Sequence, residues 1–288
     1  MSKQARAFMV NISAITRQGI DAIRYTPVNP RGLVIWYHGW SSKMAGQELR
    51  ALAFANAGWE VIVPAAIYHD NRGEIDYEDP KSYPYFWKTL FQNVRESDIW
   101  MDYARENGYK LIVPSGHSMG GFSALGVAAQ QKAVSGVVAI NGSGHWPLSH
   151  LFFQARFGQM YPLAAEINKA VEEMSPHMHA QALKKKPFYL IHGAADNSVD
   201  PRADVEFTTI LQDAGADVKT EFIDNLGHFV TTGMLVSATD WLGKRFFCTQ
   251  VKRRKYEISS NASAGTGTQQ CSVPGNFTEA PWRRTCFD

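Results

Sequence analysis

Three short segments of the chain carry side chains that together could perform acyl transfer. The first is Gly-His-Ser-Met-Gly at 116–120, the second contains Asp196, and the third contains His228. A serine hydroxyl is a weak nucleophile until a base accepts its proton, and a third group must orient that base. We therefore predict that Ser118, Asp196 and His228 form a catalytic triad.

The surroundings of Ser118 are more informative than its G-x-S-x-G pattern, which by itself is common in ordinary loops. An apolar run at 110–113 precedes the pattern, and small residues such as Ala124 and Gly126 follow it. This order indicates a strand, a sharp turn and a helix, with glycines that allow the turn to lift the serine above a sheet. Ser118 is the predicted nucleophile.

Two aspartates compete for the role of triad acid. Asp196 and Asp200 both follow the apolar run at 187–191, which we expect to be a strand. Either could orient the histidine, and either could cap the helix expected to begin near Pro201. We favour Asp196 because it lies nearer the end of the strand.

The histidine is selected by its position, because the chain contains nine histidines. His228 follows both other candidates and lies between the last expected strand and the last expected helix. His117, His145 and His192 are expected to be structural residues that hold loops or fill the wall of the site.

The tetrahedral intermediate of acyl transfer also needs N–H donors for its oxyanion, each worth about 3–4 kcal/mol in comparable enzymes. The N–H of Met119, directly after the nucleophile, is one expected donor. We expect the second from the loop after the run at 32–38 and choose the N–H of Trp40. The alternative is that Trp40 only packs against a lid, and both could hold at once.

Strands and helices that alternate along most of the chain must position these residues. Strands are expected at 7–14, 20–27, 32–38, 59–64, 110–113, 134–140, 187–191 and 217–223, the first two joined by a turn at 18–19. Helices are expected at 45–57, 85–106, 201–214 and 230–246, besides the one after Ser118. This order predicts an α/β protein with a mostly parallel central sheet wrapped by helices. The candidate segments would meet at the carboxyl edge of that sheet.

Two stretches interrupt the alternation. Residues 146–186 lie between two expected strands, where an insertion would cover the carboxyl edge, so we interpret them as a small helical lid. Residues 248–288 contain a polar run without periodicity and are expected to be a disordered tail. The folded domain is therefore predicted to comprise residues 1–247.

Substrate contacts are less well marked in the sequence. Trp146 and Phe153, from the expected lid, could line an apolar pocket, but a lid helix must bury such residues against the body in any case. His38, near the oxyanion loop, is a further candidate contact. Arg72 could bind an anionic substrate group, or it could lie in a solvated loop held by local ion pairs.

Composition excludes several classes of partner. The chain has 288 residues, with 29 Lys and Arg against 27 Asp and Glu, so its charge does not suggest nucleic acid or an anionic membrane. It has neither an apolar run of transmembrane length nor an N-terminal signal-peptide core. The three cysteines lack metal-ligand spacing, so we expect no metal site. A cytoplasmic protein is the simplest interpretation.

The arrangement resembles the α/β-hydrolase superfamily, and within it the serine esterases related to the prolyl-oligopeptidase and dienelactone-hydrolase groups. The resemblance covers about residues 20–247 and rests on His-Gly-Trp at 38–40, on 116–121, on His-Gly-x-x-Asp at 192–196 and on Gly-His at 227–228. The loop at 68–73 and the short lid also resemble small bacterial esterases of this branch. The resemblance implies an α/β-hydrolase fold and cofactor-free hydrolysis of carboxylic esters. The apolar residues of the expected lid would suit a small-molecule ester with a short acyl chain or a small aromatic group.

The chain departs from parts of this family. Its nucleophile is Ser118, whereas dienelactone hydrolases have Cys, and we see no N-terminal propeller of the prolyl-oligopeptidase kind. Two alternatives stay open: a peptidase or amidase, and a binding protein that kept the fold but lost the chemistry. Relatives with an Asp nucleophile, the dehalogenases and epoxide hydrolases, are disfavoured because Ser118 holds that position.

Overall fold

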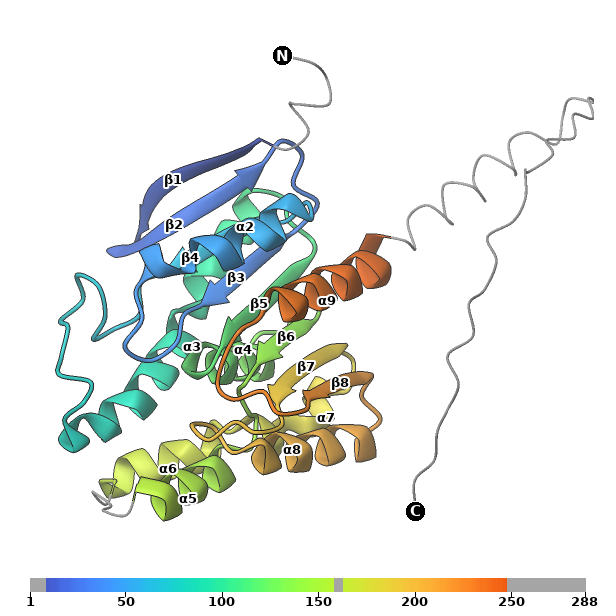
Figure 1. The fold of residues 1–288 in the computed structure, drawn as a ribbon. Coiled ribbons are helices and arrows are strands. Elements are labelled where there is room, and N and C mark those ends of the chain that lie inside the picture. Colours follow the sequence, from blue (N-terminus) through green and yellow to red (C-terminus); the bar gives the residue numbers. More distant parts are fainter. Residues whose placement is uncertain (1–8, 158–162, 248–288) are drawn as a thin grey trace, which may run out of the picture. The chain divides into compact units, whose positions relative to one another are not determined.

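A computed structural model describes residues 9–157 and 163–247 and contains one central sheet (Figure 1). The strands are β1 (Val10–Arg17), β2 (Ile20–Pro27), β3 (Leu33–Tyr37), β4 (Glu60–Pro64), β5 (Ile112–His117), β6 (Val137–Ile140), β7 (Phe188–Gly193) and β8 (Val218–Ile223). Their order in the sheet is β1-β2-β4-β3-β5-β6-β7-β8. The pairs β1–β2 and β2–β4 are antiparallel, and the other neighbours are parallel. This is the α/β-hydrolase fold that the sequence predicted.

The central strands are apolar along their whole length because helices cover both faces of the sheet. Every residue of β3, β4, β6 and β7 is buried, as is usual for parallel strands between two helical layers. On one face α2 (Glu48–Asn56) contacts α9 (Thr232–Leu242). On the other, α3 (Tyr83–Glu106) packs on α4 (Met119–Gln130), and α8 (Pro201–Asp213) lies beside β7 and β8 (Figure 1).

Most predicted boundaries agree with the structure to within two residues. The first strand differs: it runs from 10 to 17 instead of 7 to 14, and residues 7 and 8 lie outside the described residues. The hairpin turn explains the shift. Gln18 and Gly19 have φ values of +48° and +79°, as a two-residue hairpin loop requires. Such a loop fixes the register, so Val10 pairs with Pro27 and the strand must end at Arg17.

The region predicted as a lid forms short helices between β6 and β7. They are α5 (Trp146–Phe157), α6 (Ala165–Glu173), a 3₁₀ turn (Pro176–His179) and α7 (Ala180–Leu183). The first two contact each other, whereas α7 packs on α4 and α8. The last part of this insertion therefore belongs to the helical layer of the body.

The compact unit that contains the sheet extends to Phe246, close to the predicted domain end at 247. The predicted disordered tail, 248–288, lies outside the described residues. Within residues 9–157 and 163–247, no helix combines the length and the apolar character needed to cross a lipid bilayer.

Candidate active site

Ser118 occupies a strained turn between β5 and α4. Its φ and ψ are +57° and −126°, a conformation that costs a non-glycine residue energy and persists only when its surroundings impose it. Its N–H donates to Ile140 O at 2.9 Å, and its carbonyl accepts from the N–H groups of Gly121 and Phe122. The neighbouring strand and the first turn of α4 together hold this conformation.

The glycines on either side of Ser118 are required by close backbone packing. A Cβ atom on Gly120 would lie 1.9 Å from Tyr37 O, and one on Gly116 would lie 2.4 Å from the carbonyl of Gly120. The turn therefore packs closely against the end of β3, and any larger residue at these two positions would push the turn away from that strand. This is the strand–turn–helix geometry that G-x-S-x-G predicts.

His228 connects the other two predicted residues. Its Nε2 lies 2.8 Å from Ser118 Oγ, and its Nδ1 lies 2.6 Å from Asp196 Oδ2. The loop between β8 and α9 carries His228, and the loop after β7 carries Asp196. The structure thus brings together three residues that are far apart in the sequence. In this arrangement His228 donates from Nδ1 to the carboxylate and accepts the serine hydroxyl hydrogen at Nε2.

The carboxylate of Asp196 is buried and fully hydrogen-bonded. Its Oδ1 accepts from the N–H groups of Ser198 at 2.8 Å and Val199 at 3.0 Å, and its Oδ2 lies 3.4 Å from His192 Nε2. Burial by itself would raise the pKa of Asp196, but hydrogen bonds from His192 and His228 outweigh burial and hold this pKa well below its usual range. The carboxylate is therefore ionised at neutral pH.

The rival acid, Asp200, has a different role. Its side chain accepts from the N–H of Arg202 at 2.9 Å as the N-cap of α8. It also binds the guanidinium of Arg202 at 2.5 Å. The structure therefore brings Asp196 to His228 and leaves Asp200 at the start of the helix.

The two predicted oxyanion donors flank Ser118. Met119 is the first residue of α4, so its N–H has no acceptor within the helix. In the described part of the chain, neither this N–H nor that of Trp40 donates a hydrogen bond. A Cβ on Gly39 would lie 3.6 Å from Ser118 Cβ, so the loop that carries Trp40 runs close to the nucleophile.

The ring of Trp40 does not pack as the alternative expected. It makes edge contacts with Tyr77 and His69 from the loop before α3, and with Phe86 on α3, at centroid distances of 5.1, 5.3 and 6.0 Å. The described contacts of this ring are thus with the loop at 65–79 and with α3, not with the insertion. The reason is that the loop at 65–79 lies beside the loop at 38–43, which carries Trp40 and which we call the oxyanion loop.

His38 and Asp70 connect the loop that carries Trp40 with the loop at 65–79. His38 is 2% exposed; its Nδ1 lies 3.0 Å from Gly39 O, and its Nε2 accepts from Ala66 N at 3.4 Å. Burial lowers the pKa of His38, so the ring is neutral. Asp70 accepts from Met44 N at 3.3 Å. His38, predicted to contact substrate, instead holds the oxyanion loop.

Two further predicted substrate contacts are occupied elsewhere. The guanidinium of Arg72 binds both carboxylate oxygens of Glu96, at 2.5 and 2.9 Å, and donates to Ala65 O, which favours the alternative of local ion pairs. Trp146 is fully buried against Trp87 and Phe91. Trp146, the first residue of α5, belongs to the hydrophobic core.

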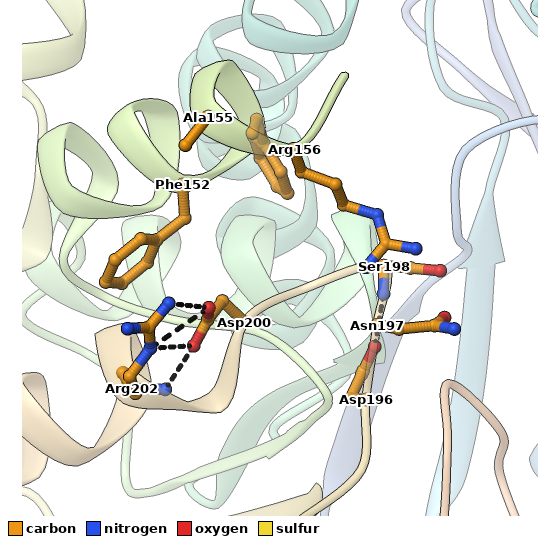
Figure 2. A pocket seen from close by; sticks show the side chains of 9 residues that line it. Phe152, Ala155, Arg156, Asp196, Asn197, Ser198, Asp200 and Arg202 are labelled. Atoms are coloured by element: carbon orange, nitrogen blue, oxygen red, sulfur yellow. Dashed lines mark hydrogen bonds and ion pairs between the residues drawn. The ribbon is translucent and has the colours of Figure 1, made fainter. Parts of the chain in front are cut away.

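Phe153 lines a cavity beside Asp196. The cavity measures about 220 Å³ and lies between α5 and the segment at 196–202 (Figure 2). Its lining residues are Phe152, Phe153, Ala155, Arg156, Asp196, Asn197, Ser198, Asp200 and Arg202. The two aromatic rings and Arg156 come from α5, and the other polar groups come from 196–202, where the Arg202 guanidinium lies 4.4 Å from the Phe152 ring centroid.

The histidines expected to be structural have defined partners. The His117 ring lies 4.8 Å from that of His228, and burial together with His228 lowers its pKa to about 3. His145 stacks on His177 with ring centroids 4.0 Å apart. His192 lies buried between Asp196 and Asp204. Across 9–157 and 163–247, no group of three or more His, Cys, Asp and Glu residues has the geometry of a metal site.

Asn141 is a structural support that the sequence analysis missed. Its Nδ2 donates to His117 Nε2 at 3.2 Å and to Phe229 O at 3.1 Å, and its Oδ1 accepts from Gly193 N at 2.9 Å. One side chain thus connects the ends of β5 and β7 with the loop that carries His228. The sequence signal is a polar residue directly after a buried strand. In the structure the φ of Asn141 is +49°, which Asn tolerates.

Comparison with known proteins gives consistent matches. The model of the prolyl oligopeptidase family matches residues 99–245, just over half of the chain. The esterase YjfP of Escherichia coli (strain K12) is 27% identical over 220 residues, which cover 73% of this chain and 88% of YjfP.

Solved structures share the fold at lower identity. TT1662 from Thermus thermophilus has a TM-score of 0.68 and 18% identity, covering 82% of this chain and 98% of its own. A puromycin-hydrolyzing peptidase of Mycobacterium tuberculosis has a TM-score of 0.66 and 17% identity, covering 83% of this chain but 40% of its own.

Proposed function

The chain belongs to the prolyl oligopeptidase family, and from that premise we propose that it is a serine hydrolase that cleaves small carboxylic esters. The observation that supports this most directly is the pair of hydrogen bonds made by His228, to Ser118 at 2.8 Å and to Asp196 at 2.6 Å. These contacts match the roles of nucleophile, base and orienting acid.

In the acylation half of the reaction, Ser118 Oγ attacks the ester carbonyl carbon while His228 Nε2 accepts the hydroxyl proton. The carbonyl π electrons move onto oxygen, and the N–H groups of Met119 and Trp40 hold the resulting oxyanion. When the tetrahedral intermediate collapses, the bond to the alcohol oxygen breaks and His228 returns the proton to the departing alcohol. The acyl group remains on Ser118.

Deacylation repeats these steps with water as the nucleophile. His228 removes a proton from the water as it attacks the acyl carbon, and the same two N–H groups hold the second oxyanion. Collapse releases the carboxylic acid and restores the hydroxyl of Ser118. The ionised carboxylate of Asp196 stabilises the imidazolium of His228 in both halves. The chemistry we propose uses no cofactor.

The cavity next to Asp196 supports a proposal for the substrate class. A volume of about 220 Å³ suits a short acyl chain or one small aromatic ring, and the rings of Phe152 and Phe153 offer an apolar wall. We assign this cavity to the part of the substrate beyond the scissile ester. The name of the relative YjfP, an esterase, supports the same chemistry.

A peptidase is the second candidate, because the family and the Mycobacterium tuberculosis neighbour are both named for peptide or amide cleavage. The triad chemistry is the same for both bond types. The curated relative YjfP, of which the match covers 88%, is instead named an esterase. We therefore rank ester cleavage first.

The test is hydrolysis of p-nitrophenyl esters from acetate to laurate by the wild type and by Ser118→Ala. We expect turnover that falls with acyl length and a loss of several orders of magnitude in kcat for the variant, because triad members act as a unit. Equal rates for both proteins would overturn the proposal. Faster turnover of aminoacyl anilides than of esters would favour the peptidase.

A catalytically silent binding protein is distinguished by chemical labelling. A fluorophosphonate probe reacts quickly only with an activated serine, so the wild type should be labelled and Ser118→Ala should not. Absence of labelling in both proteins would favour the silent alternative.

A further inference from the structure

A second histidine lies on the far side of the triad acid, enclosed by the protein. His192 stands on β7 with no exposed side-chain surface, and Asp204 faces it from α8 with 2% exposure. His192 Nδ1 lies 3.3 Å from Asp204 Oδ2. Its Nε2 lies 3.1 Å from Val199 O and 3.4 Å from Asp196 Oδ2. Both ring nitrogens therefore face oxygen atoms.

The chemistry of these oxygens fixes where the protons are. A backbone carbonyl can only accept a hydrogen bond, so Nε2 of His192 must carry a hydrogen that points to Val199 O and Asp196 Oδ2. A neutral ring with this hydrogen would present a lone pair at Nδ1 to the carboxylate of Asp204, and two acceptors would then face each other. A proton must therefore lie between Nδ1 and Asp204.

The surroundings favour placing this proton on the ring. Burial opposes a charge on His192, but hydrogen bonds to Asp196 and Asp204 outweigh burial and raise the pKa of His192 to about 9. Burial raises the pKa of Asp204, and His192 opposes that change. The other groups that act on His192 do not alter this balance: Asp200 adds a negative charge from the start of α8, His117 is neutral, and Phe222 stacks on the ring from β8.

We propose that His192 is a buried imidazolium held between Asp196 and Asp204, and that it acts as a positioning residue for the triad. This role rests on the proposed function, whereas the charge state of His192 does not. Asp196 Oδ2 accepts from His228 on one side and from His192 on the other. The cation fixes this oxygen in line with His228 Nδ1 and keeps the carboxylate ionised.

Loss of this cation should change the charge next to the triad. His192 lies between Asp196 and Asp204, so it is closer to His228 than Asp204 is. Its positive charge therefore affects His228 more strongly than the negative charge of Asp204 does. Removal of the Asp204 charge lets His192 lose its proton, and the uncompensated carboxylate of Asp196 then favours protonation of His228. The acid limb of kcat/KM should accordingly move to higher pH.

The first measurement is the protonation state of His192 in the full chain, read by nitrogen-15 NMR of the imidazole ring. We expect both ring nitrogens to be protonated at pH 7 and the second proton to be lost near pH 9. A ring that is neutral at pH 7 overturns the proposal. This measurement needs no variant and no substrate, so it decides the charge state even if Ser118 proves inactive.

The second measurement compares pH profiles of ester hydrolysis for the wild type, Asp204→Asn and Asp213→Asn. Asn keeps the shape of Asp204 and can donate to Nδ1 of a neutral His192. Asp213 is exposed on the same helix and controls for the loss of one negative charge. We expect Asp204→Asn to shift the acid limb upward by about half a pH unit, and Asp213→Asn to leave it unchanged.

These outcomes separate the two proposals. An unchanged acid limb in an Asp204→Asn protein whose His192 is neutral by NMR overturns the positioning role and leaves the proposed hydrolase intact. Loss of all activity in Ser118→Ala together with a charged His192 in the wild type supports both. If Asp204→Asn does not fold, His192→Gln, which can still donate to Val199 O, takes its place in the pH profile with the same expected shift.

Discussion

Asp196 accepts a hydrogen bond from His228 Nδ1 at 2.6 Å. Asp200, only four residues later, binds Arg202 instead. Both carboxylates follow the same strand, so their different partners come from the course of the loop. The backbone turns after Gly193, and the N–H groups of Ser198 and Val199 hold the first carboxylate. This difference gives a direct test of the triad acid.

Replacement of Asp196 by Asn should lower kcat for p-nitrophenyl acetate by about 10⁴-fold, because an amide cannot hold the required tautomer of His228. Asp200→Asn is the matched control. Asn is as good an N-cap as Asp, and Asp200 lines the cavity without contacting His228, so this variant should change KM but keep kcat close to that of the wild type. A comparable loss in the two variants would contradict the assignment of Asp196.

The turn at Ser118 predicts a large cost for a single methyl group. A Cβ on Gly120 would lie 1.9 Å from Tyr37 O, whereas a Cβ on Gly243 meets nothing within 4 Å. Gly120→Ala should lower the free energy of unfolding by about 3 kcal/mol or more, since backbone atoms cannot move aside. Gly243→Ala should instead stabilise the protein by about 0.5–1 kcal/mol, because Gly243 already has helical φ and ψ. Urea denaturation measures both, and equal midpoints would show that the close contact is absent.

The fold, and the proximity of Ser118 and Asp196 to His228, could be predicted from the sequence because both depend on local patterns. A buried parallel strand is a nearly continuous apolar run, and a helix after a strand has its own periodicity. Ser118 stands directly after β5, and Asp196 and His228 lie in the loops that follow β7 and β8. Once the strands are known, the sheet itself brings their ends to one edge.

Long-range side-chain contacts could not be predicted in the same way. Trp146 and Phe153 belong to one helix that is apolar on nearly all sides, so no periodicity tells which residue enters the core and which lines a cavity. Asn141 connects the ends of β5 and β7 with the loop that carries His228 through one amide, and a lone Asn carries no pattern. The pairing of Arg72 with Glu96 likewise depends on how the loop meets α3.

Stability should depend on pH through His192. Its pKa is raised from 6.5 to about 9 in the folded protein, so the folded state binds the proton more tightly. The resulting stabilisation is fully present below pH 6.5 and is lost as the pH rises through 9. Lys186 acts in the opposite sense, because burial lowers its pKa to about 8 and folding is then favoured as the pH rises above 8.

Comparison of the wild type with Asp204→Asn cancels the contribution of Lys186, which both proteins share. The wild type should be more stable by about 1–2 kcal/mol at pH 6, and the difference should shrink steadily toward pH 9. Urea titrations at pH 6, 7.5 and 9 measure it. A difference that stays constant over this range would mean that His192 does not gain a proton on folding.

The cavity beside Asp196 predicts how acyl-chain preference can be changed. Phe152 lines the cavity, whereas its neighbour Leu151 is 57% exposed on the same helix. Phe152→Ala should enlarge the cavity and move the optimum of kcat/KM from short p-nitrophenyl esters toward longer ones, mainly through a lower KM for the longer chains. Leu151→Ala removes a similar amount of apolar surface from the outer side of the helix and should leave the preference unchanged. If both variants keep the wild-type order of esters, the acyl chain does not enter this cavity and the substrate must bind on another side of Ser118.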